Sequence, residues 1–177
     1  VGSGKTIVAT IAMVATALTG KQAALMVPTE ILAEQHMLTI EKLIQETPLK
    51  AVLLTGSMNR SQKKRKELLA QIESGEANLV IGTHALFQQD VNFKDLAFVV
   101  IDEQHRFGVQ QRQALAGKGA GVNVLQMTAT PIPRTLAITA FGEMDTSILG
   151  EIPRGRQPIK TTWVREQEME QIFDFVE

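Results

Sequence analysis

The sequence predicts an α/β fold in which helices flank an open parallel sheet. Short apolar segments recur along the chain, and most of them are continuous rather than alternating, as is typical of strands covered on both faces. The segments between them have helical periodicity, and this alternation of strands and helices favours an open α/β domain. The predicted strands, in order, are Ala23–Val27, Ala51–Thr55, Leu79–Gly82, Phe98–Asp102, Val122–Thr128 and a short one near Ser147–Leu149.

Three helices are predicted among the first of these strands. The stretch Thr6–Gly20 is shorter than the roughly 20 apolar residues that span a membrane, so it is predicted to be a core helix. Thr29–Glu46 is predicted to be an amphipathic surface helix, and Asn59–Glu73 a third helix that ends before Gly75. The apolar stripe of the second helix consists of Leu32, Ala33, Met37, Ile40, Leu43 and Ile44.

The composition limits the chemistry of the chain. A hydrophobic content of 44% over 177 residues is enough for one ordinary core. With no Cys and three His, a disulfide framework and a thiolate zinc site are excluded, so a metal would be held by oxygen atoms. The net charge of −1 gives no overall attraction to nucleic acid or to an acidic membrane, so such a partner would depend on a few placed groups.

The only stretch dense in Pro and Gly is Gly150–Pro158, which is predicted to be an interdomain linker. Residues 1–149 are then one domain, and residues 159–177 are the beginning of a second. Because the chain opens on Val1 inside a motif, we expect it to be a fragment whose first strand lies upstream.

That motif is Val1-Gly-Ser-Gly-Lys-Thr6, the second half of the phosphate-binding loop G-x-x-x-x-G-K-[ST]. Glycines let the backbone N–H groups and the start of the following helix surround a polyphosphate. Lys5 would reach the β and γ phosphates, and the Thr6 hydroxyl would bind Mg²⁺. The alternative is a glycine-rich helix start with an incidental Lys-Thr pair.

A second motif is Phe98-Val-Val-Ile-Asp-Glu-Gln-His105, in which an apolar strand runs into two carboxylates. Burying adjacent carboxylates is costly without a cation. In a phosphate-loop enzyme Asp102 would hold Mg²⁺, and Glu103 would orient and deprotonate the attacking water. Two solvated acids at the end of a strand are the alternative. The hydroxyls of Thr128-Ala-Thr130 also follow a strand and could hydrogen-bond the acidic motif.

The three histidines receive different interpretations. His36 lies in the apolar stripe of the second helix, so we interpret it as a partly buried structural residue rather than a ligand. His84 follows a predicted strand, and both a structural and a ligand-facing role stay open. His105 adjoins the acids and is favoured as a functional residue. The basic run at residues 63–66 is interpreted as a solvated helix face rather than a nucleic-acid patch.

These motifs occur in the order found in the first motor lobe of superfamily 2 helicases, and the acidic motif resembles their DExH box. The longer strings, which cover nearly the whole chain, are similar to the RecG family of bacterial ATP-dependent DNA helicases. Transcription-repair coupling translocases share some of the strings but typically carry Glu at the position of Gln104. The strings are Pro28-Thr-Glu-Ile-Leu-Ala-Glu-Gln-His36, Gly82-Thr-His-Ala-Leu-Phe87, Asp102-Glu-Gln-His-Arg-Phe-Gly108 and Met127-Thr-Ala-Thr-Pro-Ile-Pro-Arg-Thr-Leu136.

The resemblance implies a RecA-like lobe with ATP and Mg²⁺ as cofactors. It implies that the triphosphate is bound by Gly2, Ser3, Gly4, Lys5 and Thr6, with Thr6 and Asp102 at the metal. Catalytic roles would fall to Lys5, Asp102, Glu103, Gln104 and His105, and coupling of hydrolysis to motion to Thr128, Ala129 and Thr130. The positions that match backbone-contacting motifs for DNA are Pro28, Thr29, Glu30, Thr55, Gly56, Thr83 and His84.

We therefore expect a motor-lobe fragment of a helicase that acts on branched duplex DNA. As a fragment without the arginine finger of a second lobe, it is expected to be inactive alone. We expect a monomer in the bacterial cytoplasm with no membrane partner. The competing hypothesis is a non-enzymatic module that binds nucleotide or docks a partner.

Overall fold

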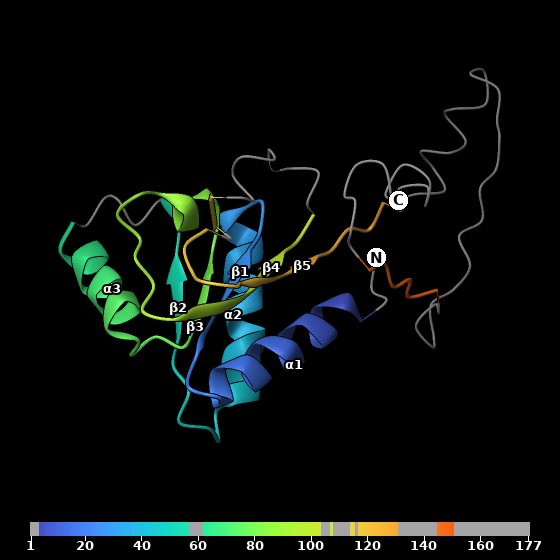
Figure 1. Cartoon of the computed structure of the whole chain (residues 1–177), viewed down its shortest axis with the longest axis horizontal. Coiled ribbons are helices and arrows are strands. Elements are labelled where there is room, and N and C mark those ends of the chain that lie inside the picture. Colours follow the sequence, from blue (N-terminus) through green and yellow to red (C-terminus); the bar gives the residue numbers. More distant parts are fainter. Residues whose placement is uncertain are drawn as a thin grey trace, which may run out of the picture.

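The computed structural model describes residues 4–56, 62–103, 107, 114–115, 117–130 and 145–150. Within them, α-helices and parallel strands form three layers, with the sheet in the middle (Figure 1). The helices are α1 (Lys5–Leu18), α2 (Glu30–Ile44) and α3 (Gln62–Ser74), with a short 3-10 helix η2 (His84–Phe87). The strands are β1 (Gln22–Met26), β2 (Ala51–Leu54), β3 (Leu79–Gly82), β4 (Leu96–Ile101) and β5 (Asn123–Gln126).

All five described strands pair in parallel, in the order β2-β3-β1-β4-β5. The predicted open parallel sheet is therefore confirmed. The inner strands β1 and β3 are buried at every position, which explains their continuous apolar sequences. The outer strands β2 and β5 are only partly buried, in keeping with their place at the two edges of the described sheet.

Alternate residues of each strand contribute to two separate cores. One core contains Ala23 and Leu25 of β1 and is covered by α1 and α2. The other contains Ala24 and Met26 and is covered by α3 and η2. The period-two alternation of a strand thus sends neighbouring side chains of β1 to opposite helical layers.

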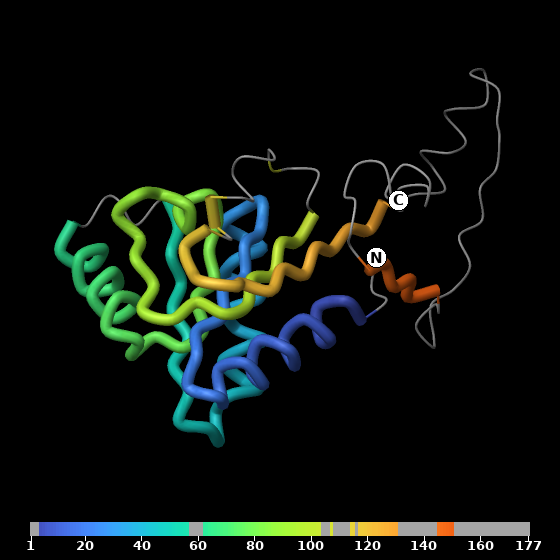
Figure 2. Tube along the Cα trace, viewed as in Figure 1, coloured from blue at the N-terminus to red at the C-terminus, as the bar shows by residue number. Residues whose placement is uncertain are grey.

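The direction of α1 places its first residues near the carboxyl ends of the strands. The helix ends at Leu18, and the turn through Gly20, whose φ is +84°, leads directly into β1 (Figure 2). The end of α1 therefore lies at the amino ends of the strands, and the helix runs back across the sheet. Fourteen residues of helix extend about 21 Å, enough to bring the start of α1 to the carboxyl ends of the strands.

A buried amide at the start of β1 joins three segments at the opposite edge. The Nε2 of Gln22 donates to the carbonyl oxygens of Ile72 and Ala77, at 2.9 and 2.7 Å. Its Oε1 accepts from the backbone N–H groups of Lys94 and Asp95, at 2.8 and 3.0 Å. All four hydrogen-bonding positions of the amide are used, so Gln22 fixes the end of α3 and the start of β4 against β1.

Several sequence predictions need correction. The strand predicted near Ser147–Leu149 is wrong: residues 145–150 have no regular structure, and Ile148 is 81% exposed. Leu43, assigned to the apolar stripe of the second helix, is 48% exposed, whereas its neighbour Ile44 is buried, so the buried face of α2 is narrower than predicted. The predicted core helix α1 is buried on one side only, at Ala9, Thr10, Met13 and Ala17, since it is an outer layer.

Strand and helix ends differ from the predictions by a few residues, as hydrogen-bonding partners rather than side-chain type decide where a strand ends. Residues 151–158 of the predicted linker and the predicted second unit at 159–177 lie outside the described residues. Of the helices in the described part of the chain, none is long and apolar enough to cross a membrane.

Candidate nucleotide site and strand-contact surface

The candidate phosphate loop leads directly into α1. Gly4 is the N-cap of this helix and has φ +81°, a left-handed conformation that favours glycine. Lys5 and Thr6 are then the first two helical residues, so the N–H groups of the first helical turn adjoin both side chains. This is the arrangement that binds phosphate at a helix N-terminus. Gly2 and Ser3 lie outside the described residues.

The two acids follow β4 at the carboxyl edge of the sheet. Asp102 is half-buried, and its Oδ1 accepts the backbone N–H of Glu103 at 3.0 Å. Glu103 has φ +49°, and among the described residues it is the one non-glycine residue with a positive φ. A left-handed glutamate is strained, and such strain is typical of residues held in place for a function. Gln104 and His105 lie outside the described residues.

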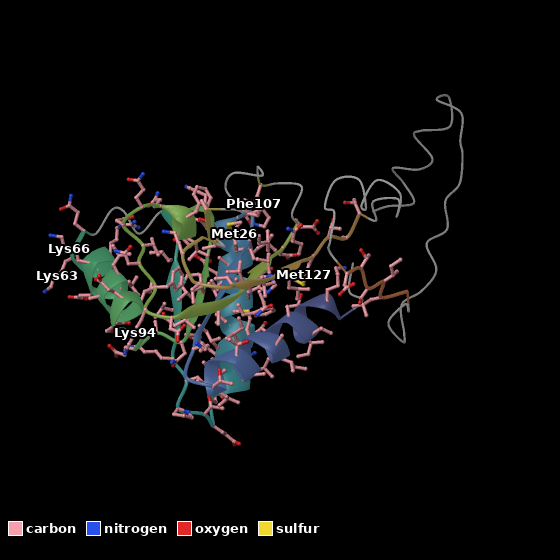
Figure 3. All side chains as sticks on the ribbon, viewed as in Figure 1. Met26, Lys63, Lys66, Lys94, Phe107 and Met127 are labelled. Atoms are coloured by element: carbon pink, nitrogen blue, oxygen red, sulfur yellow. The ribbon has the colours of Figure 1, made fainter. Side chains whose placement is uncertain are left out.

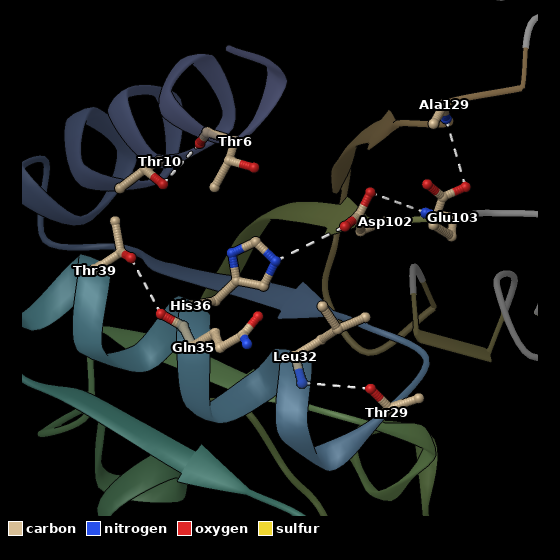
Figure 4. Close-up of polar contacts among 10 residues, drawn as sticks. All are labelled: Thr6, Thr10, Thr29, Leu32, Gln35, His36, Thr39, Asp102, Glu103 and Ala129. Atoms are coloured by element: carbon tan, nitrogen blue, oxygen red, sulfur yellow. Dashed lines mark hydrogen bonds and ion pairs between the residues drawn. The ribbon is translucent and has the colours of Figure 1, made fainter. Parts of the chain in front are cut away.

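The threonine motif after β5 contacts the second acid. Glu103 Oε2 accepts from Thr128 Oγ1 at 3.4 Å. It also accepts the backbone N–H of Ala129 at 3.5 Å, as Figure 4 shows. The Thr128 and Thr130 hydroxyls are 3.0 Å apart, and Thr128 Oγ1 also accepts the Thr130 N–H at 3.1 Å. Because β4 and β5 are paired, their carboxyl ends bring together residues 25 and 26 positions apart in the chain.

His36 lies against the first acid. Its Nε2 is 3.8 Å from Asp102 Oδ2, and its side chain is 11% exposed. Figure 4 shows the imidazole pointing from α2 toward the end of β4. The interpretation of His36 as partly buried is confirmed, and the structure adds that its polar neighbour is the Asp102 carboxylate. A histidine inside an otherwise apolar stripe was the only sequence signal, and it could not reveal which strand end α2 crosses.

A second group of candidate residues gathers after β1, β2 and β3. A Cβ built on Gly56 would lie 3.4 Å from Glu30 Oε1 and 3.6 Å from His84 Cε1, so both side chains flank this glycine. Thr29 caps α2, its Oγ1 accepting the Leu32 N–H at 3.3 Å. We call Thr29, Glu30, Gly56 and His84 the strand-contact cluster.

The two remaining threonines of these motifs are buried. Thr55 is 3% exposed and Thr83 is 2% exposed. The Thr83 hydroxyl is itself buried and has no hydrogen-bond partner among the residues that the structure describes. Neither hydroxyl is therefore presented to a ligand in this conformation. His84, in contrast, is exposed and lies beside Phe87, with 6.4 Å between the ring centroids.

The basic run on α3 is a solvated helix face for three of its four residues. Lys63, Lys64 and Lys66 are exposed (Figure 3). Arg65 points inward, and its Nη2 donates to Gln88 Oε1 at 2.8 Å and to Asp90 Oδ2 at 2.7 Å. This residue therefore anchors the segment after η2 rather than extending a basic patch.

Lys118 holds the same segment from the other side. Its Nζ donates to the carbonyl oxygens of Gln88 and Val91, at 2.8 and 2.7 Å. Burial lowers the pKa of Lys118, and the nearby Asp90 carboxylate opposes that shift.

The donor set at the carboxyl edge fits a hard cation carried by a phosphate ligand. Mg²⁺ usually binds one or two carboxylates together with substrate phosphates and water. Asp102 supplies a carboxylate and Thr6 a hydroxyl, whereas no group of three or more His, Asp or Glu side chains gathers among the described residues. A carboxylate and a hydroxyl are ligand types that fit Mg²⁺ bound together with a nucleotide.

A parallel sheet with a glycine-capped helix start, a carboxylate pair and a threonine motif at one edge is typical of nucleotide-binding α/β lobes. The chain belongs to the DEAD/DEAH box helicase family, which it matches over residues 1–138. It is 55% identical to the ATP-dependent DNA helicase RecG of Streptococcus pneumoniae and to that of Bacillus subtilis, over all 177 residues. RecG of Staphylococcus epidermidis is 57% identical over 173 residues. The chain spans about a quarter of the length of these curated relatives (25–26%).

Solved structures agree with this placement. The structure of RecG bound to a three-way DNA junction matches 99% of this chain and 23% of the solved chain, with a TM-score of 0.83 and 39% identity. The Mycobacterium smegmatis helicase Lhr, solved with ssDNA and AMP-PNP, matches 67% of this chain and 16% of its own, with a TM-score of 0.52. At 17% identity, the likeness to Lhr shows the fold alone.

Proposed function

We propose that the chain is the first motor lobe of an ATP-dependent DNA helicase that acts on branched DNA. The observation that carries this proposal is the similarity to RecG along the whole chain, which includes both candidate motifs at the carboxyl edge. One of the similar structures is RecG on a three-way junction, which supports a branched substrate.

In this proposal ATP binds as its Mg²⁺ complex. Lys5 and the start of α1 hold the phosphates, and Thr6 and Asp102 hold the metal. When bound, Mg²⁺ offsets negative charge on the transferring phosphoryl group. Glu103 orients the attacking water and takes its proton. Its contacts with Thr128 and Ala129 hold its carboxylate in place and link it to the segment after β5.

The strand-contact cluster holds DNA through the phosphate backbone. Backbone contacts position a protein without reading sequence, so a chain of net charge −1 needs only a few placed groups. Glu30 and His84 flank Gly56, whose lack of a side chain lets both of them lie close to its backbone. The buried Thr55 and Thr83 then act by shaping the backbone of their loops, since their hydroxyls are not exposed.

The test is ATP hydrolysis by the helicase that contains this lobe, measured with a three-way junction, with linear duplex of the same length and without DNA. The proposal predicts that the junction stimulates hydrolysis more than the duplex does. Equal stimulation by junction and duplex would refute the preference for branched DNA but would still support an ATP-driven motor. Nucleotide binding without hydrolysis under any condition would favour the competing hypothesis of a docking module.

A further inference from the structure

We propose that His36 is a positioning residue that fixes the Asp102 carboxylate for the metal–nucleotide complex; this inference rests on the proposed function. The carboxylate lies between two nitrogen atoms. The backbone N–H of Glu103 donates to Oδ1 at 3.0 Å, and His36 Nε2 lies 3.8 Å from Oδ2. The first contact is a hydrogen bond and the second a longer polar contact, and together they favour one orientation of the carboxylate before nucleotide arrives.

The placement of His36 is fixed by its helix. Ala33 and Ile40, three residues before and four residues after it, are 0% and 1% exposed. Residues at these spacings share one face of a helix, so burial of the two neighbours sets the rotation of α2. The Thr29 cap fixes where the helix begins. His36 is therefore held toward the end of β4 by the packing of α2 rather than by its own contact alone.

The environment makes this contact significant. The side chains of His36 and Asp102 are 11% and 17% exposed, so water screens their interaction less than it would at the surface. Groups that orient a metal-binding side chain are worth about 10- to 100-fold in metal affinity or activity. A purely structural histidine would be expected to find its partner in the core, whereas this one faces the acid that the motif assigns to the metal.

The experiment compares His36→Ala and His36→Gln with Met37→Ala in the complete helicase. Met37 is the adjacent residue of α2 and packs partly buried on the core, so it reproduces a loss of packing without a contact to Asp102. For each protein, ATPase kcat and KM are measured across a range of free Mg²⁺, and the melting temperature is recorded. Gln keeps an N–H donor of similar reach to the imidazole.

His36→Ala is expected to lower kcat and to raise the Mg²⁺ concentration for half-maximal activity, each by about 10- to 100-fold. The KM for ATP at saturating Mg²⁺ should stay within about threefold, since the phosphate loop is intact. His36→Gln should recover most of the Mg²⁺ response. Met37→Ala should lower the melting temperature and leave the Mg²⁺ response unchanged.

An unchanged Mg²⁺ response in His36→Ala, or the same response in His36→Ala and Met37→Ala, would overturn the positioning role. If the alanine variant does not fold, His36→Gln and His36→Asn decide, because the shorter Asn does not reach Asp102; equal Mg²⁺ responses would refute the proposal. A wild-type helicase that hydrolyses ATP normally separates this failure from a failure of the proposed function.

Discussion

Replacing Gln22 with Ala tests whether the buried amide fixes the end of α3 and the start of β4. The substitution removes four hydrogen bonds. The Ile72 carbonyl oxygen still accepts the N–H of Gly75 at 3.1 Å, so the groups left unsatisfied are the carbonyl oxygen of Ala77 and the N–H groups of Lys94 and Asp95. A buried polar group left unsatisfied costs about 1–3 kcal/mol. Water entering the space left by the side chain favours the lower limit, so the loss is about 3 kcal/mol for the three groups. At about 2–4 °C per kcal/mol, the melting temperature should fall by roughly 6–12 °C.

The assay is thermal unfolding of the purified 177-residue chain, followed by circular dichroism. Gln35→Ala is the matched control, because Gln35 is an exposed glutamine of α2, and it should shift the melting temperature by less than about 2 °C. If Gln22→Ala melts within that same range of the wild type, the four hydrogen bonds do not hold these segments together and the reasoning is refuted.

Three further predictions concern Lys5 of the phosphate loop, Thr128 of the threonine motif and the partly buried Lys118. Lys5→Ala should abolish ATP hydrolysis and leave junction binding largely unchanged, because the lysine binds the phosphates of ATP and not DNA. ATP hydrolysis near the wild-type rate, together with normal junction binding in a gel-shift assay, would refute the assignment of the phosphate loop. Thr128→Ala should reduce DNA unwinding more than ATP hydrolysis, and equal losses in the two assays would contradict a coupling role. Burial lowers the pKa of Lys118, so between that pKa and 10.5 the unfolded chain binds more protons than the folded chain. In that pH range the free energy of unfolding of the wild type, relative to that of Lys118→Met, should therefore rise with pH, as measured by urea titrations. A difference that is constant or falls with pH would contradict the burial of this amine.

The fold could be predicted because its inner strands β1 and β3 are buried on both faces. The predicted segment at Leu79–Gly82 has the observed bounds, and β1 begins one residue earlier than predicted, at Gln22. Gln22 was missed because a glutamine has no apolar signal. Its burial depends on hydrogen-bonding partners that are at least 50 residues away in the sequence. The order β2-β3-β1-β4-β5 was not predicted, since it is decided by how the strands pack and not by any one of them.

The candidate site was predicted as motifs, with the hydroxyls of residues 128–130 expected to hydrogen-bond the acidic motif, and the structure adds the geometry of that contact. Parallel strands carry their carboxyl ends to one edge, which is why Glu103 meets Thr128 and Ala129. The strained φ of Glu103 has no sequence signal. The position of His36 depends on how α2 crosses the sheet, and the periodicity of one helix contains no information on the strand end opposite it.

The most direct test of the central claim is a single-turnover measurement on Glu103→Gln. Labelled ATP is bound to the complete helicase, excess unlabelled ATP is added, and retained and cleaved nucleotide are separated over time. Glutamine keeps the shape of the side chain but cannot take a proton, so ATP should stay bound while cleavage slows by about 10²- to 10⁴-fold. Cleavage within tenfold of the wild-type rate would contradict the role of Glu103 as the base. Loss of ATP retention would place Glu103 at the metal instead.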